Sequence, residues 1–108
     1  MEGRVWDAFK VVEIIDRSQQ QFHRVFERPD LVVGVLRILP GGVDTQGTHT
    51  EDEVYAVVGG RGLLRLGDID HPVAPGSIIL VPQGVPHRFH GNSELLTVTY
   101  VLVPPPQP

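Results

Sequence analysis

Short runs of alternating hydrophobic and polar residues fill most of this chain, and glycine and proline separate them. Runs of this length with period-two alternation are typical of β-strands in a sandwich or barrel. The 12 glycines and 10 prolines supply the turns that such a fold needs. The pattern therefore predicts an all-β protein, a double-stranded jelly-roll barrel of roughly eight or nine short strands. The expected strands are residues 22–27, 31–39, 53–58, 63–66, 69–73, 77–81, 87–90 and 94–103.

The two ends of the chain differ from this pattern. Residues 1–19 form an N-terminal extension, in which the β-branched cluster Val11, Val12, Ile14 and Ile15 favours a strand over a helical turn. We find no sustained apolar face of a helix. Residues 104–108 are almost all proline, which predicts a disordered tail outside the sheet. A chain of 108 residues fits one domain, 1–108.

The run from Leu31 to Leu39 is largely apolar on both of its faces. A strand buried on both faces lies between the core and a second layer, which is often a partner subunit. Its two faces carry Leu31, Val33 and Val35 on one side and Val32, Leu36 and Ile38 on the other.

Composition narrows the class of partner. The formal net charge is −4, from 13 acidic and 9 basic residues, and no basic run stands out, so nucleic acid is not an expected partner. The chain has no cysteine, which excludes disulfides and thiolate zinc sites and is consistent with the cytoplasm, where we expect the protein. No secretory core opens the sequence and no apolar run approaches spanning length, so we expect no membrane segment.

The first candidate for chemistry lies where a glycine-rich loop leads into an apolar strand. His49 precedes Glu53, and Glu53 shares a strand face with Tyr55 and Val57. A carboxylate that points into an apolar barrel is unfavourable unless a positive group meets it. No lysine or arginine lies nearby on that face in the sequence, and a metal ion would meet the need.

A second candidate lies between Gly76 and Gly91. His87 opens a strand directly after a turn built from Pro82, Gly84 and Pro86. These residues restrict the backbone, and a rigidly held imidazole is suited to metal binding.

The two stretches together resemble the motifs of the cupin superfamily of small β-barrels. The first cupin motif is matched by Gly41, His49, Glu53 and Gly60. The second is matched by Gly76, Pro82, Gly84 and His87, while Gly91 stands in place of the asparagine and Asn92 follows it. The resemblance extends over residues 20–103 and implies a small single-domain cupin barrel.

One ligand position departs from the cupin pattern, because Gly47 stands where the first histidine of the motif is expected. The resemblance therefore implies three metal ligands, His49, Glu53 and His87, with Gln46 or water as a fourth. Nitrogen and oxygen ligands without sulfur suit Mn, Fe, Ni, Cu or Zn and do not choose among them. The alternative is a relic site, in which the same residues form a polar cluster without metal.

The resemblance leaves three classes of function open. The first is a small metalloenzyme, similar to a dioxygenase or an isomerase, that acts on a small organic substrate. Glu53 would balance the metal charge or move a proton, and Tyr55 is the second catalytic candidate. The others are a non-catalytic binding module and a structural cupin with a vestigial site. The resemblance also implies that such short chains are often dimers, so we expect a homodimer.

For the remaining residues we expect mainly structural positions. Tyr55 and Phe89 could pack in the core instead of lining a pocket. His90 is expected to face away from His87 on its strand. We expect surface, packing or loop positions for His23, Arg37, Glu51, Asp52, Arg65 and His71, with Arg37 and Arg65 as the alternative contacts for an anionic substrate.

Overall fold

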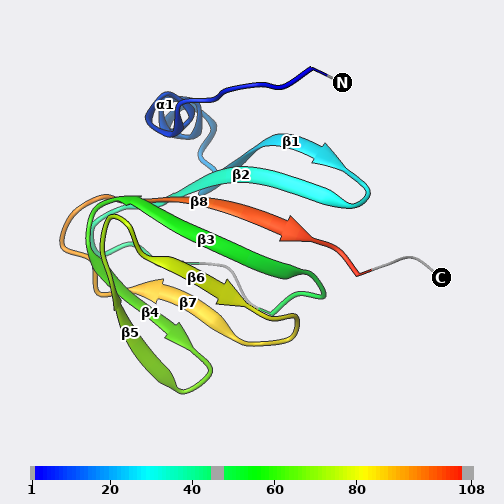
Figure 1. Ribbon diagram of the computed structural model, residues 1–108. Helices are drawn as coiled ribbons and strands as arrows, with labels where there is room; N and C mark the ends of the chain where they lie inside the picture. The colour runs from blue at the N-terminus through cyan, green and yellow to red at the C-terminus, as the bar shows by residue number, and fades with distance from the viewer. Residues whose placement is uncertain (1, 45–47, 106–108) are drawn as a thin grey trace.

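The protein is described by a computed structural model over residues 2–44 and 48–105, and Figure 1 shows its arrangement. In these ranges one helix is followed by eight strands. The elements are α1 (Ala8–Ser18), β1 (Phe22–Arg28), β2 (Leu31–Ile38), β3 (Asp52–Gly59), β4 (Gly62–Leu66), β5 (Ile69–Val73), β6 (Ile78–Val81), β7 (His87–His90) and β8 (Leu96–Val103).

The strands form two antiparallel sheets with the hydrophobic core between them. The larger sheet has the order β1-β2-β8-β3-β6, and the smaller has β5-β4-β7. Buried side chains from both sheets meet in one cluster, for example Tyr55 and Val98 from the larger sheet and Leu64 and Phe89 from the smaller. The predicted all-β jelly-roll fold is confirmed.

The prediction of a strand at Val11–Ile15 is wrong, since these residues lie in α1. The Asp7 side chain caps the helix by accepting from the backbone N–H groups of Phe9 and Lys10. Val11, Val12 and Ile15 then fall on one helical face and are buried. β-Branching is a weaker influence than this cap together with the surface on which the helix packs.

Helix α1 covers part of the outer face of the larger sheet (Figure 1). Its buried face packs on Val35 of β2, outside the main core. The Arg37 guanidinium donates from Nε to the Asp16 carboxylate at 2.9 Å and ties β2 to the helix. The second layer over β2 therefore comes in part from the chain's own helix, where the sequence suggested a partner subunit.

The ends of the chain give two further observations. Pro104 and Pro105 follow β8 without joining a sheet, and the rest of the tail, 106–108, is outside the described residues, so its disorder stays a prediction. No helix in the described ranges is long and apolar enough to cross a membrane.

Candidate metal centre

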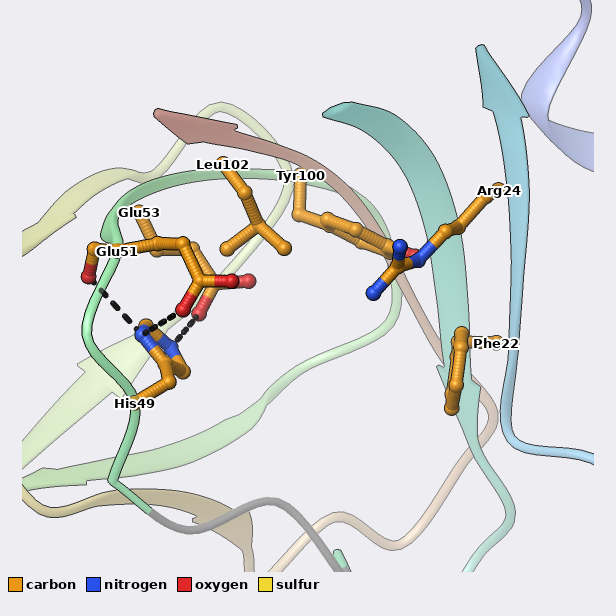
Figure 2. A pocket seen from close by; sticks show the side chains of 7 residues that line it. All are labelled: Phe22, Arg24, His49, Glu51, Glu53, Tyr100 and Leu102. Atoms are coloured by element: carbon orange, nitrogen blue, oxygen red, sulfur yellow. Dashed lines mark hydrogen bonds and ion pairs between the residues drawn. The ribbon is translucent and has the colours of Figure 1, made fainter. Parts of the chain in front are cut away.

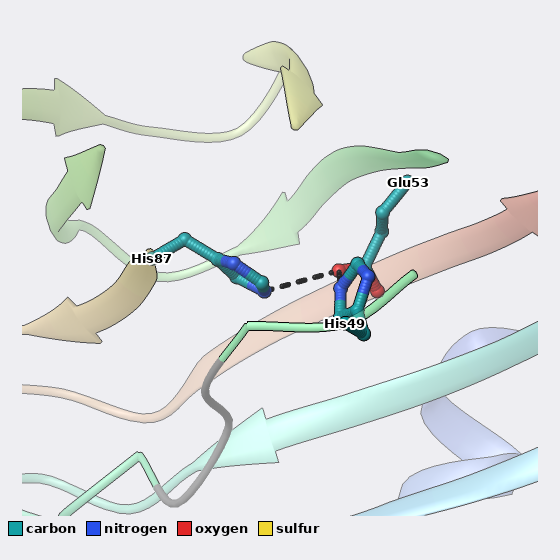
Figure 3. A group of neighbouring side chains, drawn as sticks. All are labelled: His49, Glu53 and His87. Atoms are coloured by element: carbon teal, nitrogen blue, oxygen red, sulfur yellow. Dashed lines mark hydrogen bonds and ion pairs between the residues drawn. The ribbon is translucent and has the colours of Figure 1, made fainter. Parts of the chain in front are cut away.

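Three side chains from separate parts of the chain meet inside the jelly roll (Figure 3). Glu53 is the second residue of β3 and points into the core with Tyr55. His87 is the first residue of β7, and its side chain points the same way as that of Phe89. His49 lies in the loop before β3. The alternation predicted for both strands is observed, with every second residue buried.

The turn before β7 holds the two histidine segments together. The Gly84 N–H donates to the His49 carbonyl at 2.8 Å, and the Gln83 N–H donates to the Asp52 carboxylate at 2.9 Å. Gly84 has a φ of +78°, a conformation that favours glycine. The glycine of the second motif thus fixes the backbone at the histidine of the first.

The side-chain distances are those of a compact cluster. Glu53 Oε1 lies 2.9 Å from His49 Nε2 and 3.2 Å from His87 Nε2. The two imidazole rings meet edge to face with centroids 4.8 Å apart. Glu53 is 1% exposed and His87 is also buried, whereas His49 is partly exposed. The cluster is therefore closed on the core side and accessible beside His49.

Backbone carbonyls fix how the two imidazoles are protonated when they are neutral. His49 Nδ1 lies 2.9 Å from the Glu51 carbonyl, and His87 Nδ1 lies 3.0 Å from the Val85 carbonyl. A carbonyl only accepts, so each Nδ1 carries the proton and donates it. A neutral imidazole held in this way has its lone pair on Nε2, and both Nε2 atoms face Glu53. The contact of His49 Nε2 with Glu53 also has the geometry of a hydrogen bond.

Three acceptors consequently converge on one small volume, which needs a cation or a proton. His87 Nε2 is buried and makes no hydrogen bond among the described residues, because its contact with Glu53 lacks hydrogen-bond geometry. Two donors at about 2.1 Å from one metal ion lie roughly 3.0–3.4 Å apart, close to the observed 2.9 and 3.2 Å. All three ligand atoms lie within 4.8 Å of one another. The three side chains form a group that could hold a metal ion.

The pKa of His87 also reports the negative character of the site. Burial lowers this pKa, but the Glu53 carboxylate and the Val85 carbonyl outweigh burial and leave the pKa above its ordinary value. Positive charge at this imidazole, from a proton or from a metal, is therefore favoured by its surroundings.

The other predicted site residues are distributed as follows. Tyr55 is fully buried, with its ring 4.9 Å from that of Phe89 and 6.0 Å from that of His87. Gln46, the predicted fourth ligand, and Gly47 lie outside the described residues.

Several polar residues that the sequence offered lie away from the cluster. His90 Nε2 lies 2.8 Å from Asp70, on the other face of β7. Arg65 lies 3.7 Å from the same carboxylate. His71 is exposed on β5, and His23 lies on β1.

Asn92 has a structural role. Its buried amide nitrogen donates to three carbonyls, those of Ile38, Leu39 and Glu94, at 2.9–3.1 Å. These bonds join the loop after β7 to the end of β2.

A pocket of about 180 Å³ opens beside the cluster (Figure 2). His49, Glu51 and Glu53 form one part of its wall, and β1 and β8 supply the rest: Phe22, Arg24, Tyr100 and Leu102. Sequence reasoning missed Arg24 and Tyr100 as pocket residues. The available signal was Gly34, since a lone glycine inside an apolar strand often marks a close approach by another group.

The family is decided by comparison with known proteins. Residues 34–104 match the model of the Cupin domain. The chain belongs to the cupin family. This cupin is 43% identical over 90 residues to an uncharacterized protein of Streptomyces coelicolor, a match that covers 83% of each chain.

Solved structures agree on the fold of this cupin. A conserved protein of Klebsiella pneumoniae with a double-stranded β-helix domain aligns with a TM-score of 0.78 and 24% identity, covering 95% of this chain and 91% of its own. A cupin 2 conserved barrel domain protein of Rhodopseudomonas palustris aligns with a TM-score of 0.68 and 19% identity, covering 84% and 68%. At these identities the similarity concerns the fold alone.

Proposed function

We propose that this cupin is a metalloenzyme in which His49, Glu53 and His87 bind one divalent transition metal. The observation that carries the proposal is the convergence of two imidazole nitrogens and a carboxylate oxygen in a largely buried cluster. Nitrogen and oxygen ligands suit Mn, Fe, Ni, Cu or Zn. Gln46 or water is the proposed fourth ligand.

The proposed chemistry is that of a dioxygenase or an isomerase of a small organic substrate. When bound, the metal supplies a Lewis acid with open positions for an oxygen ligand. The pocket beside His49 and Glu53 supports small-molecule access to that side of the cluster. Glu53 balances the metal charge or holds a proton at its carboxylate.

Tyr55 is the second residue proposed for catalysis, because its ring lies next to that of His87. Its ring contacts His87 and Phe89, and within the described part of the chain it is not among the residues that line the pocket. A Tyr55→Phe variant keeps this packing and removes the hydroxyl, so a fall in turnover without a loss of stability supports the catalytic role.

The first test is elemental analysis of protein purified without added metal. We expect up to one equivalent of a transition metal in the wild type and a loss of most of it in His49→Ala, Glu53→Gln and His87→Ala. Affinity should fall by more than the roughly 10–100-fold typical of a lost partner of a ligand. His90→Ala is the matched control, because His90 faces the other side of the same strand.

A wild type that holds no more metal than His87→Ala would remove the metal from the proposal and leave a vestigial polar cluster.

A second experiment, oxygen consumption with phenols, thiols and dioxo acids, separates an enzyme from a binding module. Tight ligand binding without turnover across that panel favours the binding module.

The proposal includes a homodimer that forms through the outer face of the larger sheet. Large apolar side chains are exposed together there, on β3, β6 and β8: Val54, Ile78, Leu80 and Val103. The registers pair Val54 with Leu80 across β3 and β6, so these two share a face. A cytoplasmic location stays a prediction from the sequence, which cell fractionation tests.

A further inference from the structure

The pocket carries a cation and a phenol that the three proposed metal ligands do not use. We propose that Arg24 and the Tyr100 hydroxyl bind the carboxylate of a small organic acid whose other end reaches His49 and Glu53. This inference rests on the proposed function, because it names the substrate class of the same site. Figure 2 shows Arg24 and Tyr100 on one side of the pocket and the acidic residues with His49 on the other.

The strand registers place Arg24 and Tyr100 in one row across the sheet. Arg24 of β1 pairs with Gly34 of β2, and Gly34 pairs with Tyr100 of β8. A side chain at position 34 would begin 2.4 Å from the Tyr100 hydroxyl oxygen, so the phenol occupies the space above Gly34. The missing side chain lets Tyr100 reach across β2 toward Arg24, as Figure 2 shows.

The Arg24 guanidinium can bind a ligand in addition to its present partner, Glu27. Its NH1 lies 3.1 Å from Glu27, and the two side chains are 42% and 59% exposed. The strand irregularity between Arg24 and Phe26 allows residues three apart to meet on one side. An exposed ion pair of this kind contributes little stability, and a guanidinium has five donor hydrogens in a fork that suits a carboxylate.

The charges of the pocket give an incoming acid one orientation. Arg24 attracts a carboxylate at its end of the pocket, while Glu51, which is not among the proposed metal ligands, disfavours one beside His49. Burial raises the pKa of Tyr100 to about 12, so the phenol keeps its proton at neutral pH and can donate it. Both ends of the pocket therefore favour the same pose.

The size and remaining lining of the pocket narrow the ligand class. Its volume of about 180 Å³ lies below the roughly 300–1,000 Å³ of sites for drug-sized ligands. Phe22 and Leu102 add apolar surface to the lining. A monocarboxylic acid with a short apolar body matches these features.

The test measures binding of benzoate, phenylacetate and 3-phenylpropionate, each against its neutral amide, to the full chain as purified. Arg24→Gln should weaken binding of the best acid by about 10- to 100-fold, and Tyr100→Phe by about 3- to 10-fold. Glu27→Gln should tighten it, because this variant removes the competing carboxylate. Arg28→Gln is the control on the same strand, since Arg28 pairs with Asp30 outside the pocket.

The proposal is overturned if no acid binds more tightly than its amide, or if Arg24→Gln binds the acids as the wild type does. Metal content measured on the same preparations separates the two proposals. If the protein holds no metal but binds the acid in a way that depends on Arg24, the anion site is retained and the metal function is removed. If the protein holds metal but acid binding does not depend on Arg24, the metal function is retained and the anion site is removed.

Discussion

At the scale of single residues, Gly34 has a specific steric requirement. It lies inside a largely apolar strand, and the Tyr100 ring fills the place where its side chain would be. The nearest ring atom, Cζ, is 2.3 Å from the position of an added Cβ, well inside any normal contact. The residue is glycine because a bulky neighbour needs the space.

Gly34→Ala should therefore destabilise the protein, although alanine in place of glycine often stabilises by about 0.4–1 kcal/mol. The added methyl group has to displace the Tyr100 ring, and we expect the free energy of unfolding to fall by about 1–3 kcal/mol. Urea denaturation measures the change. Gly3→Ala is the control, since no atom lies within 4 Å of the added Cβ; equal stability of the two variants would contradict the account.

At the scale of elements, α1 depends on both its cap and its packing surface. Asp7 satisfies the first backbone donors, and Val11, Val12 and Ile15 bury one face against Val35. The second layer of the larger sheet is thus attached by a small apolar cluster and by the Arg37–Asp16 pair.

Ile15→Ala tests how much this layer contributes. Ile15 is fully buried, so its truncation should lower the free energy of unfolding by about 2–5 kcal/mol. Ile14→Ala, at a neighbouring and more exposed position, should change it by much less. The two urea midpoints give the comparison, and similar losses would mean that α1 does not pack on the sheet as described.

The strands could be predicted from the sequence because their alternation is local, and the helix could not. Its apolar residues are β-branched, and what makes them helical is the surface provided by Val35, twenty residues later in the chain than Ile15. The expected ligands His49, Glu53 and His87 lie together, as the two motifs indicated. Arg24 and Tyr100 meet only through the order β1-β2-β8, which no local pattern encodes.

At the scale of the whole molecule, the outer face of the larger sheet is divided between two kinds of cover. Helix α1 packs on the β2 side, while β3 and β6 keep apolar side chains exposed. The strand β6 is also the edge of that sheet. An exposed apolar face next to a strand edge favours association.

Leu80→Glu should convert the proposed dimer into a monomer. Leu80 is 62% exposed, so the fold should tolerate the charge, whereas a buried dimer contact should not. Ile69→Glu is the matched control, because Ile69 is 63% exposed on β5 in the other sheet. Light scattering after gel filtration measures the mass; a monomeric wild type, or a Leu80→Glu variant that stays dimeric, would remove this face as the interface.

The backbone hydrogen bonds of His49 and His87 have a consequence for redesign. Both imidazoles are oriented by carbonyl groups, and the two histidine segments are joined through main-chain atoms of Gly84. The pocket wall formed by Phe22, Arg24 and Tyr100 belongs to other strands. The pocket lining on β1 and β8 can therefore be varied independently, while the histidine pair keeps its orientation from one variant to the next.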